Sequence, residues 1–167
     1  MAAYNLIATT TVGSGGASTI VFSSIPQTYT DLLFVVSGRA TTDNPTLYVY
    51  FNGDTTAANY TFRAINGDGA SATVSAATQA WFMRVTPSSA TASTFSNGMS
   101  YIPNYTRSTF KSVSTDSVTE NNATTAYTQL NAGLWSSTAA ITSITLDPFG
   151  TDFAQYSSAS LYGIKNS

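Results

Sequence analysis

Short apolar runs separated by Gly, Pro, Asn and Asp dominate the pattern of hydrophobic and polar positions along the chain. No window of about a dozen residues keeps its apolar positions at helical spacing. β-branched and aromatic residues fill the runs, as is typical of strands. The pattern therefore predicts an all-β chain with about ten to eleven short strands. Twelve runs are candidates for these strands: 3–11, 18–24, 32–40, 46–51, 60–65, 73–77, 80–85, 93–102, 110–118, 126–135, 141–146 and 153–164.

The first two runs flank the turn Gly13-Ser14-Gly15-Gly16, which predicts that they form an opening hairpin. Residues 32–36 are apolar at both alternating positions, which indicates a central strand buried on two sides, inside a sandwich or at a subunit contact. Turn signals recur roughly every ten residues, and this spacing favours a sandwich or barrel. We expect an antiparallel β-sandwich, jelly-roll-like with an added hairpin, as a single domain over residues 1–167.

The amino-acid composition excludes several kinds of chemistry and binding. The chain has no cysteine and no histidine, so disulfides, thiolate nucleophiles and the commonest general base and metal ligand are absent. Only 8% of residues are charged, and a pI of about 4.6 with six basic residues argues against the cationic surface that nucleic-acid binding needs. Neither a membrane span nor a cleaved signal peptide is expected, because no apolar run is long enough and the N-terminal stretch lacks a basic segment.

The carboxylates give no clear catalytic pair. Asp54 and Asp68 are the best candidates for two carboxyl groups facing each other across a sugar, but both lie in Gly-containing turns that such side chains commonly stabilise. The Asp- and Asn-containing turns also lack the spacing of a dedicated calcium loop. We therefore expect a protein that is not an enzyme, with no catalytic residues, no cofactor and no metal site.

Aromatic residues and arginines are the better candidates for binding, because Tyr, Trp and Arg dominate binding hot spots. They are also the residues that would stack on sugars, and the sequence does not separate the two uses. The candidate interface or glycan contacts are Trp81, Arg84, Tyr101, Tyr105, Arg107 and Phe110.

Several segments resemble small structural proteins of tailed bacteriophages, especially cyanophages. They are 12–17 (VGSGGA), 22–26 (FSSIP), 102–105 (IPNY), 117–123 (SVTENNA), 132–136 (AGLWS) and 161–164 (LYGI). These segments span nearly the whole chain and carry no catalytic motif. The resemblance implies a virion component and assigns no particular functional residue.

Two placements follow from the resemblance. A capsid decoration or cement protein would form a homotrimer on the outer capsid surface and tie together copies of the major capsid protein. A tail-fibre or receptor-binding module would instead recognise host surface glycans. The one-domain length, without a repetitive shaft, favours the cement protein.

Overall fold

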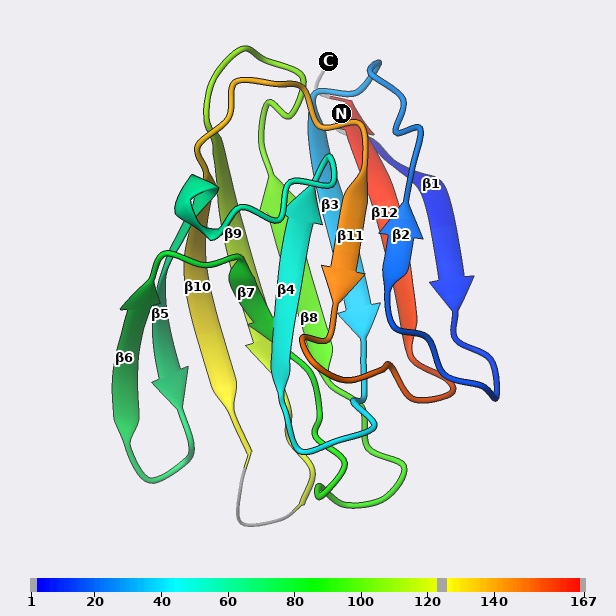
Figure 1. The fold of residues 1–167 in the computed structure, drawn as a ribbon, viewed down its shortest axis with the longest axis vertical. Helices are drawn as coiled ribbons and strands as arrows, with labels where there is room; N and C mark the ends of the chain where they lie inside the picture. Colours follow the sequence, from blue (N-terminus) through cyan, green and yellow to red (C-terminus); the bar gives the residue numbers. More distant parts are fainter. Residues whose placement is uncertain (1–2, 123–125, 166–167) are drawn as a thin grey trace.

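A computed structural model of the chain describes residues 3–122 and 126–165, which fold into two antiparallel sheets packed face to face (Figure 1). The larger sheet has eight strands. In spatial order they are β1 (Ala3–Thr11), β12 (Ser158–Lys165), β3 (Asp31–Ser37), β8 (Asn97–Ile102), β9 (Lys111–Val118), β10 (Thr128–Trp135), β5 (Tyr60–Gly67) and β6 (Ala72–Ala77). The smaller sheet is β2 (Ile20–Phe22), β11 (Ile144–Asp147), β4 (Thr46–Phe51) and β7 (Trp81–Arg84).

The strand order is that of a jelly roll. With β5, β6, β9 and β10 set aside, the chain forms four nested antiparallel pairs: β1 with β12, β2 with β11, β3 with β8, and β4 with β7. Alternate pairs fall in opposite sheets, as when one long hairpin wraps around a core. The predicted antiparallel, jelly-roll-like sandwich is therefore confirmed.

Two inserted strand pairs, β5 with β6 and β9 with β10, widen only the larger sheet. In Figure 1 the pair β5 and β6 lies at the margin, beyond the smaller sheet. Both sides of β6 are open to solvent or only half-buried. The larger sheet thus extends past its partner layer, and this extension makes the outer face of the molecule unusually wide.

The core between the sheets follows the strand alternation. Leu47, Val49 and Phe51 of β4 point inward and are fully buried, whereas the intervening tyrosines lie on the opposite side. Close approach of the layers needs glycine at Gly133, because a Cβ atom there would lie 2.7 Å from a ring carbon of Phe82. Burial of such aliphatic and aromatic surface is the main stabilising contribution to the fold.

Two predictions of the strand arrangement need correction. Residues 3–11 and 18–24 do not form a hairpin, because β1 pairs with β12 and β2 pairs with β11 in the other sheet. The described residues contain twelve strands, which matches the number of candidate runs and exceeds the expected total of ten to eleven, together with one short 3-10 helix, Ala57–Asn59. The glycine-rich turn after β1 carries the chain between layers, as the nested jelly-roll pairing requires.

A surface loop over residues 87–92 is held by one arginine. The Arg39 guanidinium donates hydrogen bonds to the carbonyls of Ser88, Ala90, Thr91 and Thr94, at 2.9–3.0 Å. Each of its two terminal nitrogens donates to two carbonyls, an arrangement that the planar guanidinium group allows. The connection between β7 and β8 is therefore an ordered part of the surface.

Candidate functional site

The six predicted contact residues do not form one site. Trp81 and Arg84 lie on the edge strand β7, and Tyr101 lies on β8 at the outer face of the larger sheet. The other three belong to the connection between β8 and β9. Only the pair on β7 is in direct contact, with the Arg84 guanidinium carbon 5.0 Å from the centre of the Trp81 ring.

Arg84 has a second aromatic neighbour that the sequence analysis missed. Its guanidinium carbon lies 4.2 Å from the centre of the Tyr127 ring, and the two contacts are cation–π interactions. Burial lowers the pKa of Arg84, and its Nε atom is buried without a hydrogen-bond partner. No local sequence signal identifies Tyr127 as the neighbour, because it lies next to β10 in the larger sheet and comes close to Arg84 only through the packing of the two sheets.

The remaining candidates differ in exposure. Tyr105 is fully buried, and its hydroxyl donates a hydrogen bond to the Pro26 carbonyl, so its ring belongs to the core rather than to a contact surface. Arg107 is exposed in the loop, where its carbonyl accepts a hydrogen bond from the buried Lys111 amine at 2.8 Å. Phe110 is 57% exposed at the end of that loop.

The outer face of the larger sheet carries most of the exposed large apolar side chains of the described residues. Strand register aligns its outward positions in two adjacent rows that cross all eight strands. One row is Leu6, Tyr162, Leu33, Tyr101, Ser114, Ala132, Arg63 and Ala76. The next row is Thr9, Ser160, Val35, Met99, Asp116, Leu130, Ile65 and Val74. We call this surface the apolar face. The only charged residues in the two rows are Asp116 and Arg63.

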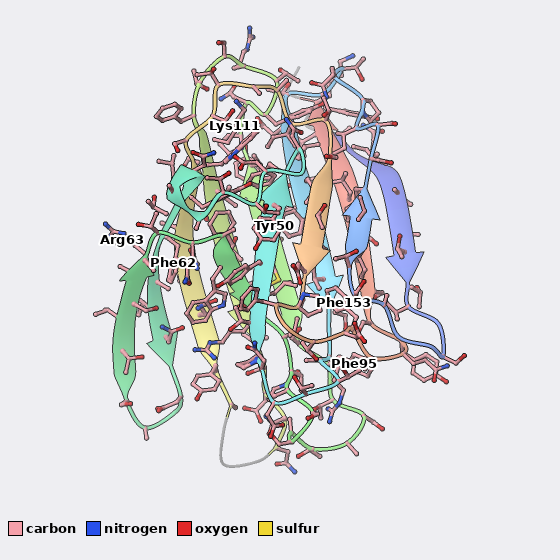
Figure 2. The ribbon with its side chains drawn as sticks, viewed as in Figure 1. Tyr50, Phe62, Arg63, Phe95, Lys111 and Phe153 are labelled. Carbon is pink, nitrogen blue, oxygen red and sulfur yellow. The ribbon has the colours of Figure 1, made fainter. Side chains whose placement is uncertain are left out.

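A shallow groove of about 470 Å³ lies on the apolar face across β10, β5 and β6. We call it the aliphatic groove; it is lined by Arg63, Ala64, Ile65, Val74, Ser75, Ala76, Leu130 and Ala132. Arg63 supplies its single charge, and its Nη1 atom donates a 2.9 Å hydrogen bond to the Phe62 carbonyl. Figure 2 shows Arg63 pointing away from the molecule at the β5 margin.

A second surface lies across the sandwich, at the loop that follows β11. The rings of Tyr48 and Phe149 stack there with centres 4.5 Å apart, and Phe149 is 48% exposed. Asp147 pairs with Tyr48 across the strands, and burial raises the pKa of its carboxyl group. A depression of about 530 Å³ adjoins these residues; we call it the loop depression, lined by Ser18, Thr19, Thr41, Thr42, Asp147, Gly150, Thr151 and Asp152.

Asp54 and Asp68 do not form a carboxylate pair. They flank opposite ends of β5, whose eight residues span more than 20 Å at about 3.3 Å each, whereas glycosidase carboxyls lie within about 10 Å of each other. Asp54 accepts hydrogen bonds from Trp135, Asn59 and Thr56, and Asp68 accepts them from Ala70 and Ser71. Both carboxylates therefore stabilise the chain turns in which they lie.

Among residues 3–122 and 126–165, no group of three or more His, Cys, Asp or Glu side chains is arranged to hold a metal ion. The same residues include no helix that is long and apolar enough to span a membrane. No protein-family model matches the sequence, and a search of curated proteins finds no match.

Proposed function

We propose that this chain is a virion structural protein, a capsid decoration or cement protein that binds the outer shell and stabilises it through subunit contacts. Jelly rolls occur in both viral capsid proteins and lectins, so the fold supports a virion role without selecting it. The resemblance to structural proteins of tailed phages is the reason for proposing a virion as its location. The chain is proposed to act without catalysis, with the major capsid protein and other copies of itself as partners.

The apolar face is the observation that carries this proposal. With Tyr4 and Val118, the next outward residues on β1 and β9, included, its strongly exposed apolar residues are Tyr4, Leu6, Ile65, Val74, Met99, Tyr101, Val118 and Leu130. With about 200 Å² for each complete large side chain, their exposed fractions amount to on the order of 800 Å². The largest contiguous apolar patch on a typical monomer is about 300–600 Å², so the total exposed apolar area on this one face is large, and large exposed apolar areas mark interaction sites.

The mechanism is passive. The protein binds the assembled shell and not the separate capsid proteins, so each bound copy lowers the free energy of the assembled state. The stabilisation therefore increases with the concentration of the protein and with its affinity for the shell. Because few charges are present, the contacts depend on apolar burial and hydrogen bonds and are little weakened by salt. This suits a protein that must stay on a particle after release from the cell.

Cryo-electron microscopy of particles that carry the labelled protein tests the placement. We expect density on the outer capsid surface at symmetric positions, and particles that lack the protein should lose DNA at lower temperature. Density confined to the tail would contradict the cement role. Unchanged resistance of the depleted particles to heat and to internal DNA pressure would contradict it as well.

A second candidate function, recognition of host surface glycans by a tail-associated module, is favoured by the loop depression. Stacked aromatic rings beside carboxylates and hydroxyls offer both a platform for a sugar ring and acceptors for its hydroxyl groups. Binding of the isolated protein to a glycan array tests this function. Phe149→Ala and Asp147→Asn should each abolish binding, whereas Phe110→Ala, at a 57% exposed aromatic elsewhere, should not.

A further inference from the structure

Arg84 differs from the other arginines in how its guanidinium group is bonded. Arg39 donates hydrogen bonds to four carbonyls, and Arg63 donates one to the Phe62 carbonyl. Arg107 is exposed, so water can accept its hydrogen bonds. The Arg84 side chain is half-buried, yet no hydrogen-bond acceptor contacts its guanidinium among residues 3–122 and 126–165.

This arrangement is costly for the isolated protein. A guanidinium carries several N–H donors in one plane, and a buried donor without a partner costs free energy. Burial lowers the pKa of Arg84, and the neighbouring Tyr127 opposes this shift. The group nevertheless stays charged at neutral pH. The fold thus holds a half-buried positive charge to which the described residues supply no counter-charge.

Neighbouring side chains fix the position of this charge. The Arg84 guanidinium carbon lies 5.0 Å from the centre of the Trp81 ring and 4.2 Å from the centre of the Tyr127 ring. Trp81 is itself held, because its Nε1 atom donates a 2.8 Å hydrogen bond to the Met83 carbonyl and its ring packs edge-on against Phe62. Cation–π contacts hold the guanidinium without supplying a hydrogen-bond acceptor. Its position is therefore fixed while its donors remain unused.

Part of this group is accessible to a ligand. Nε is the one Arg84 atom that is buried without a partner, so the terminal nitrogens Nη1 and Nη2, which also lack protein partners, reach solvent. The Tyr127 hydroxyl likewise reaches solvent and bonds to no residue in the part of the chain that the structure describes. We call Trp81, Arg84 and Tyr127 the arginine site. It lies between the edge strand β7 and the start of β10, where the larger sheet extends past the smaller one.

We propose that the arginine site binds a uronic acid, with the terminal nitrogens of Arg84 donating to its carboxylate and the Tyr127 hydroxyl bonding to a neighbouring sugar hydroxyl. A carboxylate matches the planar fork of a guanidinium in shape. It also matches the single positive charge of the site, whereas a phosphate monoester carries about two negative charges at neutral pH. An Asp or Glu side chain has no hydroxyl beside its carboxylate, so the Tyr127 hydroxyl favours a sugar.

The arginine site shares no residue with the apolar face or with the loop depression. A chain that binds no capsid could therefore still bind the sugar, and the reverse also holds. The bound carboxylate would supply the acceptors that the fold lacks around Arg84. Because such a ligand binds only the folded chain, it also stabilises the fold.

Two methyl glycosides that differ at one carbon test the site. Methyl β-D-glucuronoside carries a carboxylate where methyl β-D-glucoside carries a neutral CH2OH group. Each is titrated into the full chain, and NMR follows the Arg84 Nε–H and Trp81 indole N–H signals. We expect the glucuronoside to shift both signals saturably at millimolar concentrations. The glucoside should bind at least about tenfold more weakly, because it lacks the charge-assisted hydrogen bonds.

Variants followed by the Trp81 indole signal assign the contacts. Arg84→Gln should abolish binding of the glucuronoside, and Arg84→Lys, which keeps the charge but loses the planar fork, should weaken it about tenfold. Tyr127→Phe should weaken it about fivefold, because one hydrogen bond is lost. Arg107→Gln is the matched control at an exposed arginine and should bind like the wild type. Far-UV circular dichroism checks that each variant folds.

The inference is overturned by the absence of a saturable shift, by equal binding of the two glycosides, or by wild-type affinity of Arg84→Gln. Inorganic sulfate that competes as strongly as the glucuronoside would overturn it in favour of a general anion site. N-acetylaspartate amide that binds as tightly, with no effect of Tyr127→Phe, would overturn it in favour of an acidic side chain of a protein partner. Failure of the cement role is read separately, from particles.

Discussion

Tyr60 connects the two sheets where the inserted pair β5 and β6 leaves the jelly roll. Its side chain is fully buried, and its ring packs against Phe51, Phe82 and Trp135, with centres 6.2–6.4 Å apart. Its hydroxyl accepts a 3.0 Å hydrogen bond from the Phe51 amide and donates a 2.8 Å hydrogen bond to the Asp54 carbonyl. Burial raises the pKa of this hydroxyl, so it stays neutral at physiological pH.

Tyr60→Phe removes one oxygen atom and leaves the ring in place. The Phe51 amide then has no partner in a dry environment, and an unpaired buried donor costs about 1–3 kcal/mol. Asp54 is only half-buried, so water can reach its carbonyl and less is lost there. We expect the free energy of unfolding to fall by about 2 kcal/mol, which corresponds to a drop in Tm of about 4–8 °C for a chain of this size.

Urea denaturation followed by tryptophan fluorescence measures this change, with all proteins at one concentration because assembly adds concentration-dependent stability. Tyr4→Phe is the matched control, since Tyr4 is 64% exposed, and its free energy of unfolding should stay within about 0.5 kcal/mol of the wild type. A Tyr60→Phe protein as stable as this control would refute the assignment of a structural hydrogen bond to the Tyr60 hydroxyl.

Three further predictions concern packing and pH. Gly133→Ala forces a methyl group against the buried Phe82 ring and should lower the free energy of unfolding by about 1–3 kcal/mol, whereas Gly13→Ala meets no atom within 4 Å and should change little in thermal denaturation. Burial raises the pKa of Asp147 above its ordinary 3.8, so its ionisation costs stability as pH rises; Asp147→Asn should gain stability over the wild type between pH 3 and 7 in denaturation curves. Asp54→Asn should show the opposite trend. Burial opposes ionisation of Asp54, but the hydrogen bonds from Trp135, Asn59 and Thr56 prevail and lower its pKa. The wild type should therefore be more stable than Asp54→Asn at pH 7 and should lose this extra stability in acid.

The strand ranges could be predicted from the sequence because β-branched runs and Gly- or Asn-containing turns act locally. The turn at Asn52 and Gly53, where both residues have positive φ, ends β4 as expected. Pairing was less predictable, since β1 and β2 are adjacent in sequence but bond to β12 and β11. Each partner lies more than 100 residues away, and no local pattern specifies so distant a choice.

The candidate site was only partly predictable for a related reason. Aromatic residues and arginines drew attention to Trp81, Arg84 and Tyr101, but not to Leu130 or Ile65 in the aliphatic groove. On β10 the alternation of leucine with Gln129 and Asn131 suggests that leucine points inward, and the structure has the reverse. Whether a side chain points inward or outward depends on which side of its strand the other sheet covers, and that is known only from the fold.

The edges of the two sheets are protected differently, and this difference bears on assembly. The smaller sheet ends in β2 and β7, which have only three and four residues, a length that limits pairing with other chains. The larger sheet ends in β1 and β6, with nine and six residues that include no charge and no proline. Such edges invite pairing with other strands unless something covers them. Both edges adjoin the apolar face, so a partner that covers this face on assembly also lies beside β1 and β6 and can shield them.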